Sequence, residues 1–140
     1  MKYKTEKEIF GLVSRFEAGT ISRDEWKHAE HLVVALYYLC SSSGLSDAYC
    51  KMRSGILNYL RAIGVDFKKE MPYHETITLF WMRMVLKFKE SKNGYSIVDL
   101  TNELVEACGD KDLLFKYYSR ELLFSDRARA EFVEPDLGEF

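Results

Sequence analysis

Apolar residues recur along the chain at helical spacing, with short polar segments between them. Thr5 and Glu8 have the spacing of a capping box, and apolar residues follow every third or fourth position until Gly19 ends the pattern. Similar caps begin the patterns at Ser22 and at Ser96. The sequence therefore predicts helices over residues 5–18, 22–40, 46–63, 74–93, 96–108 and 110–118, with one or two further turns after residue 125.

No alternation of apolar and polar residues typical of a strand extends beyond a few positions. The sequence therefore predicts an all-α fold, a compact bundle of about five to six helices. The segment from Leu32 to Cys40 is apolar on nearly every side, so we expect it to form the central, buried helix. This run is much shorter than the roughly 20 residues that a membrane-spanning helix needs, so no membrane span is expected.

The length and charge of the chain narrow the class of protein. Its 140 residues fit one helical domain over residues 1–140, with an extended acidic tail at 133–140. Apolar residues make up 47% and charged residues 30%, which is typical of a globular protein rather than a disordered one. The net charge of −2 gives no bulk attraction to phosphate backbones, so no nucleic-acid partner is expected.

The cysteines bear on the cellular compartment. Cys40, Cys50 and Cys108 form no Cys-x-x-Cys pair, and their number is odd. The N-terminal residues also lack the apolar stretch of a signal peptide. Together these features predict a cytoplasmic protein with reduced thiols.

The three histidines of the chain lie in two short clusters. His28 and His31 are three positions apart, so on a helix they share one face, and this face also carries apolar residues. His74 lies at the start of a later predicted helix, on the stripe that holds Ile77 and Trp81. We therefore expect the three imidazoles to converge in the interior of the bundle.

Three converging imidazoles favour a divalent metal site. Neutral imidazole binds zinc, iron and nickel, and three of them leave a coordination position for water or a substrate. Glu75, next to His74, is the candidate fourth ligand or catalytic base. The leading hypothesis is thus a metal-binding protein or small metalloenzyme with His28, His31, His74 and Glu75 at its site, acting on a small-molecule substrate.

Other interpretations of the same residues stay open. In one, the histidines and Glu75 line a metal-free pocket of a small-molecule binding or sensing module, and Arg83 anchors an anion or pairs with an acid. In another, the histidines are structural, each satisfying a backbone carbonyl or a tyrosine. In a third, the protein is an interaction domain that binds a partner or forms a homo-oligomer through its tail with Pro135 and Phe140.

Three segments carry a resemblance to known proteins. Trp26-x-His28-x-x-His31-Leu32, the run from Tyr73 to Thr78 and the ending Phe132-Val-Glu-Pro-Asp-Leu137 resemble a family of small helical bacterial proteins. This resemblance implies kinship over most of the chain and brings no activity with it. A helical bundle with a histidine triad is also similar in architecture to the DinB-like metal-binding bundles, which implies a metal rather than a particular reaction.

Overall fold

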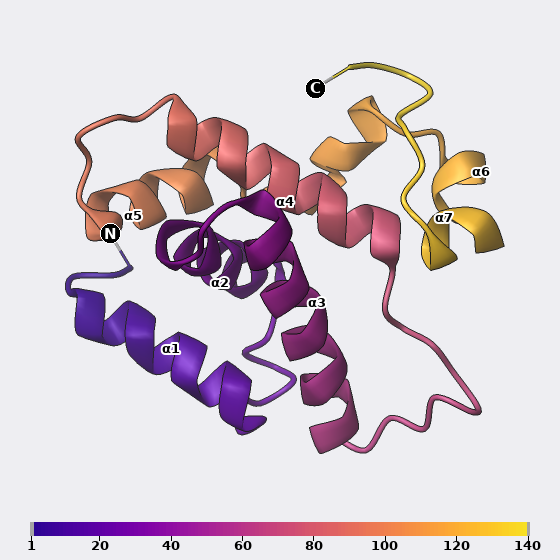
Figure 1. Ribbon diagram of the computed structural model, residues 1–140, viewed down its shortest axis with the longest axis horizontal. Coiled ribbons are helices and arrows are strands. Elements are labelled where there is room, and N and C mark those ends of the chain that lie inside the picture. Colours follow the sequence, from indigo (N-terminus) through magenta and orange to yellow (C-terminus); the bar gives the residue numbers. More distant parts are fainter. Residues whose placement is uncertain (1, 140) are drawn as a thin grey trace.

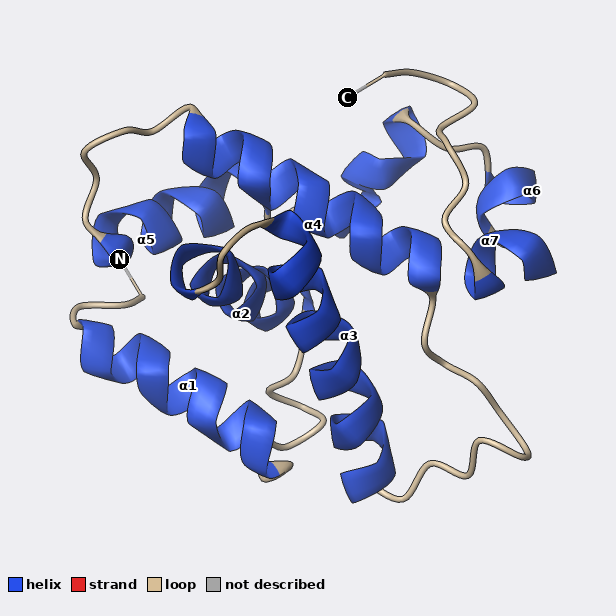
Figure 2. Cartoon of the chain, in the orientation of Figure 1, coloured by secondary structure: helices blue, strands red, loops and turns tan. Residues whose placement is uncertain are grey.

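The computed structural model describes residues 2–139, and within them every regular element is a helix (Figure 2). The all-α prediction is therefore confirmed. Five long helices are followed by three short helical segments. In chain order the elements are α1 (Glu6–Ala18), α2 (His28–Ser41), α3 (Leu45–Ala62), α4 (Glu75–Glu90), α5 (Ile97–Cys108), the 3₁₀ helix η1 (Lys111–Lys116), α6 (Arg120–Leu123) and α7 (Asp126–Ala130).

Helix α2 is the centre of the bundle, as its apolar sequence predicts. All residues from Leu32 to Leu36, together with Tyr38 and Leu39, are buried. The helix packs against α1, α3, α4 and α5, and Figure 1 shows these four helices around it. A helix that is apolar on nearly every side is shielded from water only when other helices cover each of its faces. The packing of the long helices around α2 follows from this requirement.

Local capping sets the ends of several helices where the sequence predicts them. The Thr5 hydroxyl accepts a hydrogen bond from the Glu8 N–H at the start of α1, and the Ser96 hydroxyl accepts one from the Asp99 N–H at the start of α5. Gly19 ends α1 in the left-handed conformation, at φ 72°. These boundaries are confirmed.

The predicted start of α2 at Ser22 is wrong. The Ser22 hydroxyl does accept a hydrogen bond from the Glu25 N–H, but this cap serves only one turn. The backbone is then extended at Lys27, and α2 begins at His28. The Lys27 N–H instead donates to the carboxylate of Glu30, over 3.2 Å, so a second capping interaction three residues from Lys27 starts the helix.

Ring packing explains why the chain leaves the helical path before α2. The Trp26 ring stacks on the Phe16 ring of α1, with 4.4 Å between ring centroids, and lies 4.0 Å from the His31 ring. This placement of Trp26 ties the turn before α2 to α1. Aromatic contacts of this kind contribute about 1 kcal/mol beyond burial alone, which is comparable to the contribution of a helix cap.

The C-terminal part is more broken than the sequence predicts. The helix expected over 110–118 is a shorter 3₁₀ helix, and α6 was not expected because a single turn gives no periodicity. The tail from Val133 to Glu139 is not helical and is fastened to the bundle. The Tyr118 hydroxyl donates to the Val133 carbonyl over 2.6 Å, and the Ser119 hydroxyl donates to Asp136 over 2.6 Å. The expected contact residue Phe140 lies outside the described residues.

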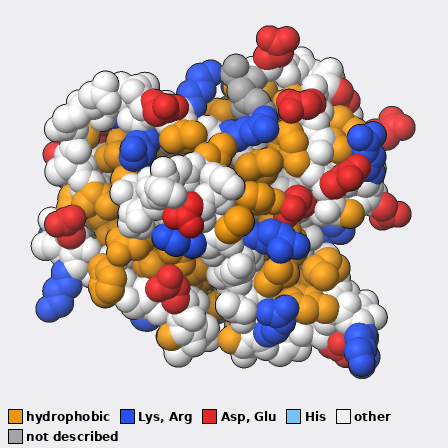
Figure 3. Space-filling view, viewed as in Figure 1, with side chains coloured by type: hydrophobic (Ala, Val, Ile, Leu, Met, Phe, Trp, Pro, Cys, Tyr) orange, Lys and Arg blue, Asp and Glu red, His pale blue; other side chains and the backbone are white. Residues whose placement is uncertain are grey.

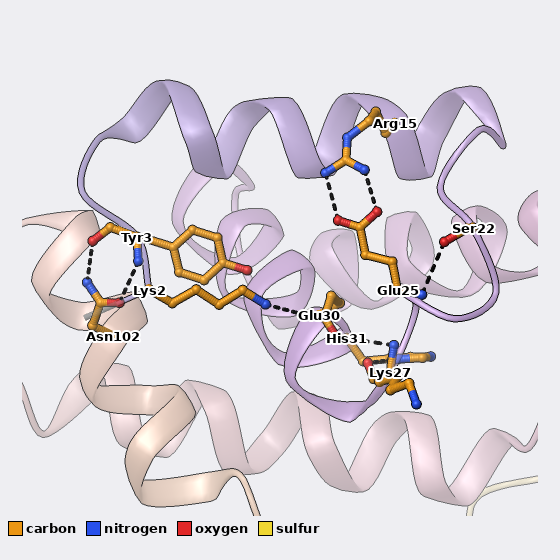
Figure 4. Close-up of polar contacts among 9 residues, drawn as sticks. All are labelled: Lys2, Tyr3, Arg15, Ser22, Glu25, Lys27, Glu30, His31 and Asn102. Carbon is orange, nitrogen blue, oxygen red and sulfur yellow. Dashed lines mark hydrogen bonds and ion pairs between the residues drawn. The ribbon is translucent and has the colours of Figure 1, made fainter.

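The N-terminal residues are fastened to the start of α2 and to α5 (Figure 4). The backbone of Tyr3 exchanges two hydrogen bonds with the Asn102 side chain, at 3.0 and 2.7 Å. The Lys2 ammonium lies 2.9 Å from the carboxylate of Glu30, which is only 5% exposed. A buried carboxylate needs such a partner, so this ion pair makes the burial of Glu30 at the start of α2 tolerable.

The surface offers no extended patch of one charge sign on the face drawn in Figure 3, where acidic and basic side chains alternate with apolar ones. Among the described residues no helix is long and apolar enough to cross a bilayer.

Helices α1 and α3 approach closely at Gly55. A Cβ atom built on Gly55 would lie 2.6 Å from Cε2 of Phe16 and 2.9 Å from its Cζ, closer than real Cβ contacts. The Phe16 ring is 1% exposed and held by the stacked Trp26 ring, so it has little room to move. In α1, a Cβ on Gly11 would meet nothing within 4 Å.

The two glycines predict opposite effects of the same substitution. Gly55→Ala should lower the free energy of unfolding by about 1–3 kcal/mol because the added methyl overpacks the α1–α3 contact. Gly11→Ala should raise it by up to about 1 kcal/mol because alanine favours the helix and nothing obstructs the methyl. Urea unfolding of both variants checks this, and a shift in the same direction for both would contradict the described α1–α3 packing.

Candidate functional site

A cavity of about 530 Å³ opens where α2 and α4 begin. Its walls come from the first half of α2, the middle of α3, the first turns of α4, η1 and the end of α6. Most of the lining is apolar or aromatic. The principal apolar lining residues are Trp26, Leu32, Met52, Ile56, Ile77, Trp81, Met82, Leu114, Phe115, Leu123 and Phe124.

All three histidines line this cavity. His28, His31 and His74 thus border the same cavity, and the close convergence of their imidazoles stays a prediction. Each ring also uses one nitrogen to bond a backbone carbonyl, which accepts and cannot donate. The bonded nitrogen must therefore carry the proton, and this assigns the tautomer of each neutral ring. The second nitrogen decides what each histidine is able to do.

His74 uses both of its ring nitrogens within the fold. Its Nε2–H donates to the Leu123 carbonyl over 2.7 Å, and its Nδ1 accepts from the Ile77 N–H over 3.2 Å. The residue is the N-cap of α4 and is 7% exposed. Burial lowers its pKa, so the ring is neutral at pH 7. In this arrangement His74 fastens α6 to the start of α4 and has no nitrogen left for a ligand.

His31 keeps one nitrogen open. Its Nδ1–H donates to the Lys27 carbonyl one turn earlier, over 2.7 Å, and its ring lies against Trp26. Burial lowers the pKa of His31 from 6.5 to about 4, so the ring is neutral at pH 7. Its Nε2 is then a hydrogen-bond acceptor or a metal ligand.

His28 also keeps one nitrogen open. Its Nε2–H donates to the Cys108 carbonyl over 2.9 Å, which ties the start of α2 to the last residue of α5. The ring meets Trp81 edge to face, with 4.5 Å between centroids. In the neutral ring Nδ1 is left to accept a hydrogen bond.

Glu75 is not among the residues that line the cavity. Its Oε1 accepts from the Tyr73 hydroxyl over 2.7 Å and from Nε of Arg53 over 3.3 Å. Burial, and then the hydrogen bond to Glu75, raise the pKa of Tyr73. Glu75 thus joins α3 to the start of α4. Its predicted role as a catalytic base or fourth ligand stays a prediction.

Arg83 lies away from the cavity lining, on α4. Its guanidinium covers the Phe132 ring, 4.4 Å from the ring centroid, and lies 3.7 Å from the Glu134 carboxylate. The pairing with an acid that the sequence suggested therefore exists, with the tail rather than with a helix.

Several lining residues had no signal of their own in the sequence. Trp26 and Trp81 place their rings beside the two open imidazoles, and Lys27 and Lys111 lie at the cavity wall. Trp26 stands two residues before His28, and Trp81 lies on the predicted stripe of His74, so each tryptophan had a hint in the sequence. Nothing in the sequence marked Lys111 as a site residue, because its position at the cavity depends on the turn that follows α5.

The described residues contain no group of three or more histidine, cysteine, aspartate or glutamate side chains placed to hold a metal ion. The four-residue metal site therefore stays a prediction. His28 and His31 are the members of it that keep an open nitrogen beside the cavity.

No protein-family model, curated protein or solved structure matches this chain. The resemblances to small bacterial proteins and to DinB-like bundles stay predictions, and a functional assignment has to come from the cavity itself.

The lowered pKa values of His31 and His74 predict a pH-dependent stability. Between pH 6.5 and about 4 the unfolded chain binds a proton at His31 that the folded protein does not. The free energy of unfolding is thus highest above pH 6.5 and falls as the pH decreases, by at most about 1.4 kcal/mol per pH unit for each of the two histidines.

Urea unfolding at pH 7, 6 and 5 measures this slope. The His31→Gln variant is the control, because glutamine does not titrate and should give a shallower slope. Equal slopes for the parent and His31→Gln would show that His31 is not held neutral by the fold.

Proposed function

We propose that this protein binds a small, largely apolar molecule in the cavity at the start of α2. The observation that carries the proposal is the pair of imidazoles, His28 and His31, that present one open nitrogen each at an aromatic wall. The volume of about 530 Å³ is in the range of small-molecule sites. Apolar walls with a few fixed polar atoms are the usual composition of such sites.

The tautomers define the hydrogen bonds that a ligand must supply. Both ring N–H groups donate to backbone carbonyls, so Nδ1 of His28 and Nε2 of His31 accept. A fitting ligand therefore carries an N–H or O–H donor next to an apolar body. The indole rings of Trp26 and Trp81, which contact the two imidazoles, favour a flat or ring-shaped body.

A second candidate is metal binding at the same two nitrogens. An imidazole that ligates a metal commonly holds its other ring nitrogen on a backbone carbonyl, as His28 and His31 both do. Two protein ligands are fewer than most zinc sites use, so water or a bound molecule would complete the coordination. Under this candidate, a divalent zinc, iron or nickel ion binds the two open nitrogens in place of the N–H or O–H group of a ligand.

Titration with N-phenyl-1-naphthylamine, a neutral fluorescent probe with two aromatic groups and one N–H, tests the proposal. The parent protein should enhance its fluorescence and melt at a higher temperature when the probe is present. Ile56→Trp fills the cavity from α3 and should weaken binding at least about tenfold. Ile63→Trp, on a partly buried residue at the end of α3 that does not line the cavity, should bind like the parent.

The outcomes separate the two candidates. Absence of probe binding in the parent, or equal affinity in Ile56→Trp, would contradict a ligand-binding cavity. Chelation with EDTA should leave the probe affinity unchanged under the leading proposal. About one equivalent of a transition metal in the untagged parent and none in His31→Ala would instead establish the second candidate.

A further inference from the structure

The charged residues of the cavity lie at its rim and are mostly cationic. Lys27 and Lys111 line the cavity, and Asp112 is the acidic residue among its lining side chains. All three residues are exposed. Within residues 2–139 the ion pairs involve neither of these lysines, although Lys2 and Arg15 nearby are both paired with acids.

One hydrogen bond brings the two lysines to the same rim. His28 donates to the Cys108 carbonyl, which holds the first residue of α2 against the last residue of α5. Lys27 immediately precedes His28, and Lys111 begins η1 three residues after Cys108. Two segments about 80 residues apart in sequence thus present their lysines beside one opening.

The deeper walls differ sharply from this rim. They are formed mainly by apolar and aromatic side chains, with Thr78 and the imidazoles, of which His31 and His74 are neutral at pH 7. Burying a charge among such side chains is costly, whereas a charge at the rim keeps its water and meets two free ammonium groups.

We infer that the ligand is an amphiphilic anion, with its apolar body inside the cavity and a carboxylate, sulfonate or phosphate group at Lys27 and Lys111. This inference rests on the ligand-binding function proposed above and specifies the chemical class of the ligand. The N–H or O–H donor that reaches the imidazoles then lies on the body of the ligand.

A matched pair of probes isolates the anionic group. The compound 8-anilinonaphthalene-1-sulfonate has the same two aromatic groups and N–H as N-phenyl-1-naphthylamine, and adds a sulfonate. The sulfonate probe should bind the parent more tightly than the neutral probe. Its affinity should also fall as sodium chloride is raised, while that of the neutral probe should not, because salt screens exposed charges.

Charge-removing variants locate the effect. The double variant Lys27→Gln, Lys111→Gln should bind the sulfonate probe about fivefold more weakly and the neutral probe as the parent does. Lys116→Gln is the matched control, because Lys116 lies on the same 3₁₀ helix as Lys111 and does not line the cavity. It should leave both affinities unchanged.

The results distinguish this inference from the proposed function. Neutral-probe binding together with an unchanged sulfonate affinity in the double variant would overturn the anion inference and leave the cavity function intact. An equal loss in Lys116→Gln would also overturn it, since the effect would then come from surface charge in general. Failure of the neutral probe to bind the parent would instead contradict the proposed function itself.

Discussion

Hydrogen bonds from imidazole N–H groups to backbone carbonyls organise the site. A carbonyl oxygen accepts only, so each of these bonds selects one tautomer and leaves one defined nitrogen on the ring. At His74 a helix N–H takes that second nitrogen, and the residue becomes a clamp between α4 and α6. At His28 and His31 the second nitrogen stays open, and this difference separates two candidate binding residues from a structural one.

The bundle supplies the reason why these open nitrogens lie beside a cavity. The apolar part of helix α2 is buried in the bundle. Its first turn lies at the cavity, and so does the first turn of α4. Trp26 and Trp81 line the space there and hold the imidazole rings by aromatic contact. The hydrogen bond from His28 to the Cys108 carbonyl joins the start of α2 to the end of α5. Lys27 and Lys111, next to these two ends, both line the cavity. Fold and candidate site therefore share the same contacts, and weakening them would lower stability and, under the proposed function, ligand affinity.

Helix ends that depend on neighbouring residues in sequence were predictable. Features that depend on tertiary contacts were not. Thr5, Ser96 and Gly19 act through their own neighbours in sequence, so their helix ends were predictable. The start of α2 depends on Trp26 packing against α1, which no local pattern encodes. Helical spacing indicated that the histidines face the interior, where all three line one cavity, but it did not indicate the partner of each ring nitrogen. Glu75 looked like a site residue from sequence because it adjoins His74, yet its side chain turns to Arg53 and Tyr73.

The most direct measurement of the central claim is a long-range ¹⁵N–¹H correlation spectrum of the histidine rings at pH 7. Such a spectrum reports, for each imidazole, which nitrogen is protonated. The structure predicts neutral rings for His31 and His74, with the proton on Nδ1 in His31 and on Nε2 in His74. A proton on Nε2 of His31, or a cationic His31 ring at this pH, would contradict the assignment of an open acceptor nitrogen at the cavity wall.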